Sequence, residues 1–333
     1  MKDSNNLLEI DDLHTFFYTD IGTARAVDGV SFSIPKGKTI GVVGESGCGK
    51  SVTSLSVMRL LQEPQGQITS GEIRFSMRDG KTVNLAKAPI KLMQHIRGNE
   101  ISMIFQEPMT TLNPVFTIGK QLDEVLLLHV EYKKKSEIRA KSIELLKLVG
   151  IANSERVYKM YPHELSGGMR QRVVIAMALA CDPQLIIADE PTTALDVTIQ
   201  AQILDLMRNL KSKINASIML ITHDLGVVAE MADLVVVMYS GRIVEMGTTV
   251  DIFKNPLHPY TIGLMKSRPN MIDKDEKLYS IPGNVPSPIN LPNHCYFKNR
   301  CEKCVAKCSD VYPELIKVSD THSVSCYLYK EEK

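Results

Sequence analysis

The chain has 333 residues, of which 44% are hydrophobic and 23% charged, and its formal net charge is +1. This length exceeds one ordinary core and predicts a main domain with a smaller appendage. A charge so near neutral argues against a protein that binds nucleic acid through a broad basic face. No apolar run approaches the about 20 residues of a membrane helix, and the polar start is unlike a signal peptide, so we expect a cytosolic protein.

The N-terminal part of the sequence predicts β-strands. Residues 7–18 alternate roughly between apolar and polar side chains, and residues 27–34 predict a second strand. Residues 72–85 predict a hairpin that turns at Asp79 and Gly80, because this dipeptide adopts the positive φ of tight turns.

From residue 39 onward, short apolar runs each end in a polar residue or a polar loop. The runs cover residues 39–43, 101–105, 185–188 and 218–222. They lead into a glycine-rich loop, Gln106, the pair Asp189-Glu190, and His223, respectively. Buried strands with polar residues at their carboxyl ends predict a parallel α/β sheet with a ligand at that edge.

The glycine-rich loop after the first of these runs fits the phosphate-loop pattern completely. Its residues are Gly44, Glu45, Ser46, Gly47, Cys48, Gly49, Lys50 and Ser51. Glycines let the backbone wrap around phosphates, Lys50 would bridge the β- and γ-phosphates, and the Ser51 hydroxyl would bind Mg²⁺. A chance glycine-rich turn is disfavoured by the strand before it and the helix after it. Cys48 occupies a permissive position.

The other polar strand ends complete a nucleotide hydrolase site. We expect Asp189 to hold Mg²⁺ through water and Glu190 to orient or deprotonate the attacking water. His223 is placed to contact the γ-phosphate, and Gln106 to sense the metal and the attacking water. Two carboxylates that merely cap a strand edge would leave the nearby phosphate loop unexplained.

Residues 107–164 turn helical in pattern and predict a helical insertion, with Ser136 as an N-cap and Gly150 as a terminator of one helix. Residues 198–213 predict an amphipathic helix, and residues 234–246 a hairpin around Ser240-Gly241. Beyond residue 255 a proline-rich linker leads to the end of the chain.

The segment Leu-Ser-Gly-Gly-Met-Arg-Gln-Arg at residues 165–172 predicts a second anion site. A serine and two glycines before an apolar helical run direct free N–H groups and the helix dipole toward an anion. Since the chain already has one phosphate loop, we interpret this segment as part of a nucleotide site shared by two subunits.

Seven cysteines are present, five of them in the last forty residues: Cys295, Cys301, Cys304, Cys308 and Cys326. In a reducing compartment such a cluster indicates a metal site before it indicates disulfides. Four thiolates fit tetrahedral zinc and an iron–sulfur cluster equally well, and free thiols that pack a small lobe are the remaining alternative.

Several motifs follow one another along the chain: the phosphate loop, Gln106, the 165–172 segment, Asp189-Glu190, Asp196 and His223. In this combination and order they resemble the nucleotide-binding subunit of ABC transporters. The resemblance covers residues 7–255. It implies an α/β fold of the P-loop NTPase class, with a RecA-like mixed sheet core, an N-terminal antiparallel β subdomain and an α-helical subdomain at about 107–171. The nucleotide-binding domain would span residues 1–256, and a small Cys-rich extension residues 257–333.

In that family two subunits dimerise head to tail and sandwich ATP. By resemblance, Ser166, Gly167 and Gly168 serve the ATP of the partner, and Asp196 couples the two sites. The adenine-stacking aromatic should be Phe17, or Tyr18 if the register slips by one residue.

Longer phrases, among them YPHELSGGMRQRV and NPLHPYT, resemble the D-type ATPase of bacterial dipeptide/oligopeptide importers. This implies an F-type ATPase partner, two membrane permease subunits, an external peptide-binding protein, and a peripheral location at the cytoplasmic face of the membrane. The spacing of Cys295, Cys301, Cys308 and Cys326 resembles the [4Fe–4S] pattern of the group, with zinc as the alternative and Cys304 as the spare.

Four other functions are disfavoured by the sequence. A soluble ABC-type ATPase of translation or DNA repair usually has two tandem cassettes or a coiled-coil insertion, and this chain shows neither. Nickel importers of the same branch commonly lack the cysteine tail. An electron-transfer protein would need a second cluster or a flavin motif, and a GTPase an Asn-Lys-x-Asp motif; none is visible.

Overall fold

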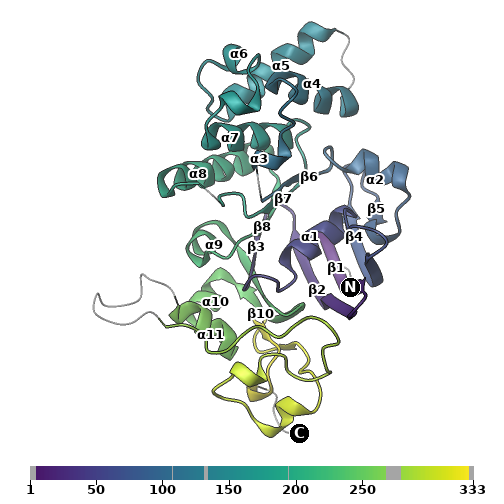
Figure 1. Ribbon diagram of the computed structural model, residues 1–333, viewed down its shortest axis with the longest axis vertical. Coiled ribbons are helices and arrows are strands. Elements are labelled where there is room, and N and C mark those ends of the chain that lie inside the picture. The colour runs from purple at the N-terminus through teal and green to yellow at the C-terminus, as the bar shows by residue number, and fades with distance from the viewer. Residues whose placement is uncertain (1–4, 107, 131–133, 194, 268–278, 330–333) are drawn as a thin grey trace.

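The computed structural model describes residues 5–106, 108–130, 134–193, 195–267 and 279–329. Two β-sheets form the centre, and a helical region lies at one end of the molecule with the C-terminal part of the chain at the other (Figure 1). This is the α/β architecture with a mixed sheet that the sequence predicts. Among the described residues, no helix combines the length and apolar character needed to cross a membrane.

The N-terminal sheet is antiparallel and has the strand order β2-β1-β4-β5. The pairing of β4 with β5 confirms the predicted hairpin, and Gly80 in its turn has a φ of 80°. The strands are β1 (Asn6–Thr19), β2 (Gly22–Pro35), β4 (Gly66–Ser76) and β5 (Thr82–Asn84).

The second sheet has the order β11-β12-β10-β9-β3-β8-β7-β6. The five strands from β9 to β6 run parallel, and β10, β12 and β11 extend that sheet in antiparallel pairing. The parallel strands place their carboxyl ends at one edge, as the sequence predicts. The strands are β3 (Thr39–Val43), β6 (Ile101–Ile104), β7 (Leu185–Asp189), β8 (Ser217–Ile221), β9 (Leu234–Tyr239), β10 (Arg242–Thr248), β11 (Ile316–Lys317) and β12 (Ser323–Val324).

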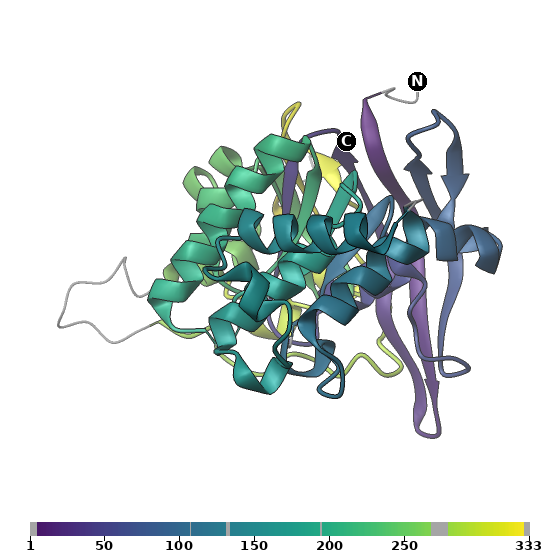
Figure 2. The same cartoon turned by 90° about the horizontal axis from the view of Figure 1, so that it is seen from above.

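Helices cover the central sheet (Figure 2). The predicted amphipathic helix is confirmed as α8, which buries Ile203, Met207 and Leu210 and is N-capped by Asp196. The helices outside the helical region are α1 (Lys50–Met58), α2 (Ile90–Ile96), α8 (Val197–Ile214), α9 (Leu225–Met231), α10 (Thr249–Lys254) and α11 (Pro259–Lys266).

The helical region is confirmed and shares one apolar core, to which Ile118, Leu146 and Val173 contribute. Its helices are α3 (Pro108–Thr111), α4 (Ile118–His129), α5 (Lys135–Leu148), α6 (Ser154–Val157) and α7 (Gly167–Ala178). The prediction of Ser136 as an N-cap is wrong, because α5 begins one residue before it with Lys134 at the cap position. Gly150 follows the end of α5 with a φ of 75°, a conformation that favours glycine.

The C-terminal part of the chain, residues 279–329, packs onto the central sheet. Strand β12 pairs with β10, so that Val324 lies opposite Glu245. Phe297 and Tyr312 share an apolar cluster with Tyr239 of β9 and Tyr260 of α11. We call residues 279–329 the C-terminal lobe. Besides β11 and β12 it contains short 3₁₀ turns at Lys298–Arg300, Ala306–Ser309 and Tyr327–Tyr329.

Candidate nucleotide site

The phosphate loop (residues 44–51) joins β3 to α1, as the sequence predicts. Two of its glycines are required by the space around them. A Cβ on Gly44, whose φ is 154°, would lie 2.2 Å from the carbonyl oxygen of Met238. A Cβ on Gly49, whose φ is 100°, would lie 2.2 Å from the carbonyl oxygen of Ala26. The neighbouring strands therefore approach the loop so closely that only glycine fits.

The side chain of Lys50 is buried within the curve of this loop. Its ammonium donates hydrogen bonds to the carbonyl oxygens of Gly44 at 2.8 Å and Glu45 at 3.0 Å. The thiol of Cys48 is buried 3.7 Å from the same ammonium. Burial raises the pKa of Cys48, so the thiol stays protonated at neutral pH. Ser46 and Gly47 are exposed at the tip of the loop.

Ser51 and Asp189 meet at the base of the loop. The Ser51 hydroxyl donates to Asp189 Oδ1 at 3.1 Å, which brings the first turn of α1 to the carboxyl end of β7. Burial raises the pKa of Asp189, and the hydrogen bond from Ser51 opposes this shift only in part. A hydroxyl and a carboxylate oxygen suit Mg²⁺, which takes few protein ligands beside phosphate oxygens and water.

Glu190 is the centre of a polar cluster. Its carboxylate accepts hydrogen bonds from Thr193 Oγ1 at 2.9 Å and Gln106 Nε2 at 3.1 Å, and His223 Nδ1 lies 3.2 Å from its other oxygen. Its backbone N–H donates to the carbonyl of Ile221 at the end of β8. Glu190 has a φ of 47°, a strained value for a residue other than glycine. The structure thus brings together Gln106, Glu190 and His223, which the sequence predicts for one site.

The charge of Glu190 follows from this cluster. Burial raises the pKa of its carboxyl, but the hydrogen bonds from Thr193 and His223 and the nearby charges of His223 and Lys50 together lower it by more, so the net shift is downward. Glu190 is therefore ionised at neutral pH and able to accept a proton. Thr193 is a site residue that the sequence analysis missed, although its position three residues after Glu190 suits a turn that folds back on the carboxylate.

The segment at residues 165–172 begins α7. Ser166 is the N-cap, and its hydroxyl accepts a hydrogen bond from the N–H of Met169 at 3.3 Å. Ser166 and Gly167 are exposed. Gly168 lies against α8, because a Cβ there would come within 2.9 Å of Ile199 Cγ2. The exposed helix start has the geometry of an anion site open to another molecule.

The two candidate adenine-stacking residues differ in environment. Phe17 is half-buried and packs over Gly66 of β4, where a Cβ would lie 2.7 Å from the ring. It shares a strand face with Thr15, whose hydroxyl lies 2.8 Å from that of Ser56 in α1. Tyr18 is 47% exposed and points to the opposite face. Phe17 therefore lies on the side of the sheet that faces α1.

The C-terminal cysteines are all free. Cys295 and Cys308 are buried, Cys301 and Cys326 half-buried and Cys304 exposed. Burial raises the pKa of Cys295 to about 12 and that of Cys326 to about 11. The nearby thiols of Cys301 and Cys308 also raise both of these pKa values. Within the described ranges, no group of three or more His, Cys, Asp or Glu side chains is arranged to hold a metal ion. The structure gives no support to the predicted iron–sulfur cluster or to zinc.

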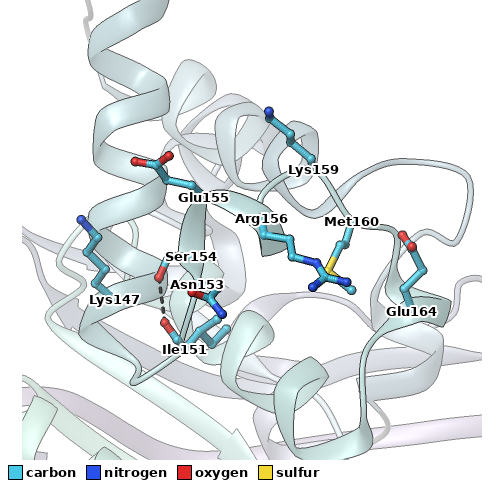
Figure 3. Close-up of a pocket in the computed structure, with 9 residues that line it drawn as sticks. All are labelled: Lys147, Ile151, Asn153, Ser154, Glu155, Arg156, Lys159, Met160 and Glu164. Carbon is cyan, nitrogen blue, oxygen red and sulfur yellow. Dashed lines mark hydrogen bonds between the residues drawn. The ribbon is translucent and has the colours of Figure 1, made fainter.

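A hollow of about 790 Å³ lies elsewhere, between α5, α6 and the segment that leads to α7. Figure 3 shows that lysine, arginine and glutamate side chains surround it, with Arg156 directed toward Met160. Neither the phosphate loop nor Glu190 contributes to its lining. The hollow is therefore separate from the site built around Lys50 and Glu190.

Comparisons with known proteins agree with this geometry. A family model described as "ABC transporter" matches residues 27–193, and one described as "Oligopeptide/dipeptide transporter, C-terminal region" matches residues 244–308. The oligopeptide transport ATP-binding protein AppD of Bacillus subtilis is 53% identical, over 98% of this chain and 98% of its own length. The dipeptide transport ATP-binding protein DppD of the same organism is 50% identical, over 97% of this chain and 94% of its own.

Solved structures show the same fold. The ATP-binding cassette MJ0796, in a dimeric post-hydrolysis state bound to ADP and Pi, superposes with a TM-score of 0.63 at 25% identity. The match covers 73% of this chain and 98% of that one. The cbiO1 protein of Clostridium perfringens, part of a cbiONQ transporter complex, gives a TM-score of 0.62 at 26% identity, over 75% of this chain and 92% of its own.

Proposed function

The chain belongs to the ATP-binding subunits of ABC transporters, in the oligopeptide/dipeptide group, and we propose that it hydrolyses ATP to power peptide import. The observation that carries the proposal is the Glu190 cluster. An ionised carboxylate, oriented by Gln106, Thr193 and His223, lies at the sheet edge that also holds the phosphate loop and the Ser51–Asp189 pair.

We assign the hydrolytic roles as follows. The N–H groups of the phosphate loop bind the phosphates, and Lys50 turns from the loop carbonyls toward the β- and γ-phosphates. Ser51 and Asp189 would hold Mg²⁺, which would neutralise phosphate charge. Glu190 accepts a proton from the attacking water, Gln106 orients that water, and His223 contacts the γ-phosphate. Phe17, with Tyr18 as the alternative, stacks on the adenine.

We further propose that two ATPase subunits complete each site. Ser166, Gly167 and Gly168 would bind the ATP held by the partner, and Asp196 would couple the sites. The exposed start of α7 supports this assignment, as does the dimeric state of the solved relative MJ0796. We propose an F-type ATPase as the partner, two permease subunits above the dimer, and an external peptide-binding protein. The chain would then lie at the cytoplasmic face of the membrane.

The division of the chain is also a proposal: residues 1–256 bind nucleotide, with the helical subdomain at about 107–171, and residues 257–333 form an extension. Within the extension we keep a four-thiolate site at Cys295, Cys301, Cys308 and Cys326 as a separate proposal, with [4Fe–4S] favoured over zinc. Its support is the spacing of these cysteines, which resembles the [4Fe–4S] pattern of the group. Visible absorption and metal analysis of anaerobically purified protein test it, with Cys304→Ser as the control variant; a colourless, metal-free protein would refute it.

The experiment that tests the function is reconstitution. The chain, its F-type partner, the permeases and the binding protein are placed in proteoliposomes, and ATP hydrolysis is measured with and without di- and oligopeptides. We expect peptide to stimulate hydrolysis and labelled peptide to accumulate. Stimulation by Ni²⁺ in place of peptides would instead identify a nickel importer, and hydrolysis that never responds to a substrate would indicate an ATPase uncoupled from transport.

A further inference from the structure

The phosphate loop is held from outside the cassette by the C-terminal lobe. Glu45, the second residue of the loop, contacts both the lobe and helix α11. Its carboxylate accepts two hydrogen bonds from the Arg300 guanidinium, Nη1 to Oε2 at 2.7 Å and Nη2 to Oε1 at 3.0 Å. Its backbone N–H donates to the hydroxyl of Tyr260 in α11 at 2.8 Å.

Arg300 is itself fixed in place. Its residue is 8% exposed, and its remaining N–H groups donate to the carbonyls of Pro282 and Ile281 and to the hydroxyl of Tyr239. The hydrogen bonds with Glu45 raise the pKa of Arg300, so the guanidinium stays charged. A partly buried, bidentate pair of this kind is geometrically specific, because both planar groups must align.

An aromatic cluster lies next to the Glu45–Arg300 pair. The rings of Tyr239, Tyr260 and Phe297 lie within 4.7–5.5 Å of one another, and they join β9, α11 and the lobe. The hydroxyls of Tyr260 and Tyr239 contact Glu45 and Arg300, respectively. The loop contact is therefore anchored in packed side chains rather than in a mobile surface.

The peptide of Glu45 is in direct contact with Lys50. Its carbonyl and that of Gly44 receive the Lys50 ammonium, so a shift of this peptide would displace the lysine that we assign to the phosphates. A loop that is already ordered loses less conformational entropy when it binds its ligand. The contacts of Arg300 and Tyr260 thus favour nucleotide binding although neither belongs to the phosphate-loop pattern.

We propose that Arg300 is a positioning residue for nucleotide binding: through Glu45, and together with Tyr260, the C-terminal lobe holds the phosphate loop in its binding shape. The proposal rests on the function proposed above for residues 44–51. It predicts that a change in the lobe, a long way along the sequence from the cassette motifs, alters the affinity for ATP rather than the chemistry of its hydrolysis.

The test uses the purified full chain and the reconstituted transporter. Arg300→Gln, Arg300→Lys, Glu45→Gln and the Glu45→Gln/Arg300→Gln double variant are compared with the wild type for Mg·ATP affinity by titration calorimetry, and for KM and kcat. Hydrogen exchange of the peptide that covers residues 44–51 reports the order of the loop. The matched control is His322→Gln, because His322 joins the lobe to β10 through a buried contact of 2.8 Å with Glu245 and does not touch the loop.

We expect Arg300→Gln to weaken ATP binding and raise KM roughly fivefold to thirtyfold, with kcat at saturating ATP within about twofold of the wild type. Loop exchange should quicken, and the double variant should be no worse than the poorer single variant. Arg300→Lys, which keeps the charge without the planar fork, should recover part of the affinity.

Two results would overturn the proposal. The first is an Arg300→Gln protein with the affinity and loop exchange of the wild type, and the second is an equal loss of affinity in His322→Gln, which would make the effect a general one of the lobe. If Arg300→Gln does not fold, Glu45→Gln decides in the same way. A wild-type chain that does not bind ATP at all would refute the proposed function instead, so the two failures are distinguishable.

Discussion

Gln171 donates a hydrogen bond from Nε2 to the carbonyl oxygen of Pro191 at 2.7 Å, and both residues are buried. Gln171 belongs to the segment that begins α7, and Pro191 directly follows Glu190. Helix α7, which we propose binds the ATP held by the partner, is therefore attached to the loop that carries Glu190, the proposed catalytic base. A movement of α7 when two subunits close would reach Glu190 through this contact.

The Gln171–Pro191 contact predicts a coupling defect. Gln171→Leu keeps the volume of the side chain but leaves the Pro191 carbonyl buried without this donor, at a cost of about 2 kcal/mol in the free energy of unfolding. We expect kcat in the reconstituted transporter to fall by roughly threefold or more, because Glu190 is less well oriented, while KM for ATP stays near the wild-type value. Denaturant unfolding and steady-state kinetics measure both. Unchanged kcat in a destabilised variant would show that the contact only supports the fold.

Glu190→Gln tests the proposed base. The amide retains the size of the side chain and accepts hydrogen bonds, but it cannot take a proton from water. We expect ATP binding to persist and hydrolysis to fall by at least about 100-fold. Titration calorimetry measures the first and phosphate release the second. Hydrolysis close to that of the wild type would remove Glu190 from the mechanism.

Thr193→Val tests the cause of the charge on Glu190. The Thr193 hydroxyl lowers the pKa of Glu190, so its loss should raise that pKa. Since only the ionised carboxylate accepts a proton, activity declines as the pH falls through the pKa. The acid limb of the pH profile of kcat/KM should therefore move to higher pH, with little change at pH 8. Thr192→Val is the matched control, and an acid limb that moves equally in both variants would contradict the assignment.

Ser166→Arg separates the two halves of the nucleotide site. The isolated chain should bind ATP at its own Lys50 within about twofold of the wild-type affinity, because α7 would serve another subunit. In the assembled transporter, hydrolysis should fall by at least about tenfold, since the bulky side chain blocks the anion site of α7. Ser136→Arg, at an exposed serine near the start of α5, controls for added size and charge. An isolated Ser166→Arg chain that no longer binds ATP would refute this division.

Asp28→Asn tests how the C-terminal lobe is attached to the cassette. Asp28 is 2% exposed and accepts hydrogen bonds from Arg242 Nε at 2.9 Å and Tyr296 OH at 3.0 Å. Its replacement leaves the Arg242 charge unpaired and should cost roughly 3 kcal/mol of unfolding free energy at pH 7. Asp11→Asn, which removes an exposed partner of Arg74, should cost less than about 1 kcal/mol.

The pH dependence of the Asp28 effect has a definite sign. Burial raises the pKa of Asp28, but Arg242, Tyr296 and His14 together lower it by more, so the folded-state value lies below the ordinary 3.8. Its stabilisation is complete above that ordinary value and is lost as the pH falls through the folded-state pKa. The difference in the free energy of unfolding between the wild type and Asp28→Asn should therefore become smaller only in strong acid. Denaturant unfolding measures this difference. A gap that closes between pH 7 and pH 5 would contradict this account.

Local patterns in the sequence were sufficient for most of the cassette. The strand at residues 39–43, the turn at Gly80 and the helix that begins after Asp196 agree with the structure. A run of apolar side chains, the conformation of a glycine and the amphipathic spacing of a helix each depend on residues close together in the chain. Ser136 failed as a cap because capping also depends on where the preceding chain enters the helix.

Contacts between distant parts of the chain required the tertiary structure. Glu45 and Arg300 are 255 residues apart, and neither side chain belongs to a spacing that reveals the other. The same holds for Gln171 and Pro191, and for the strand that the C-terminal lobe adds to β10. The sequence by itself determined the chemistry of the nucleotide site, because its motifs are local. Only the packing of the whole chain decided what holds that site in shape, because such pairs depend on the path of the backbone between them.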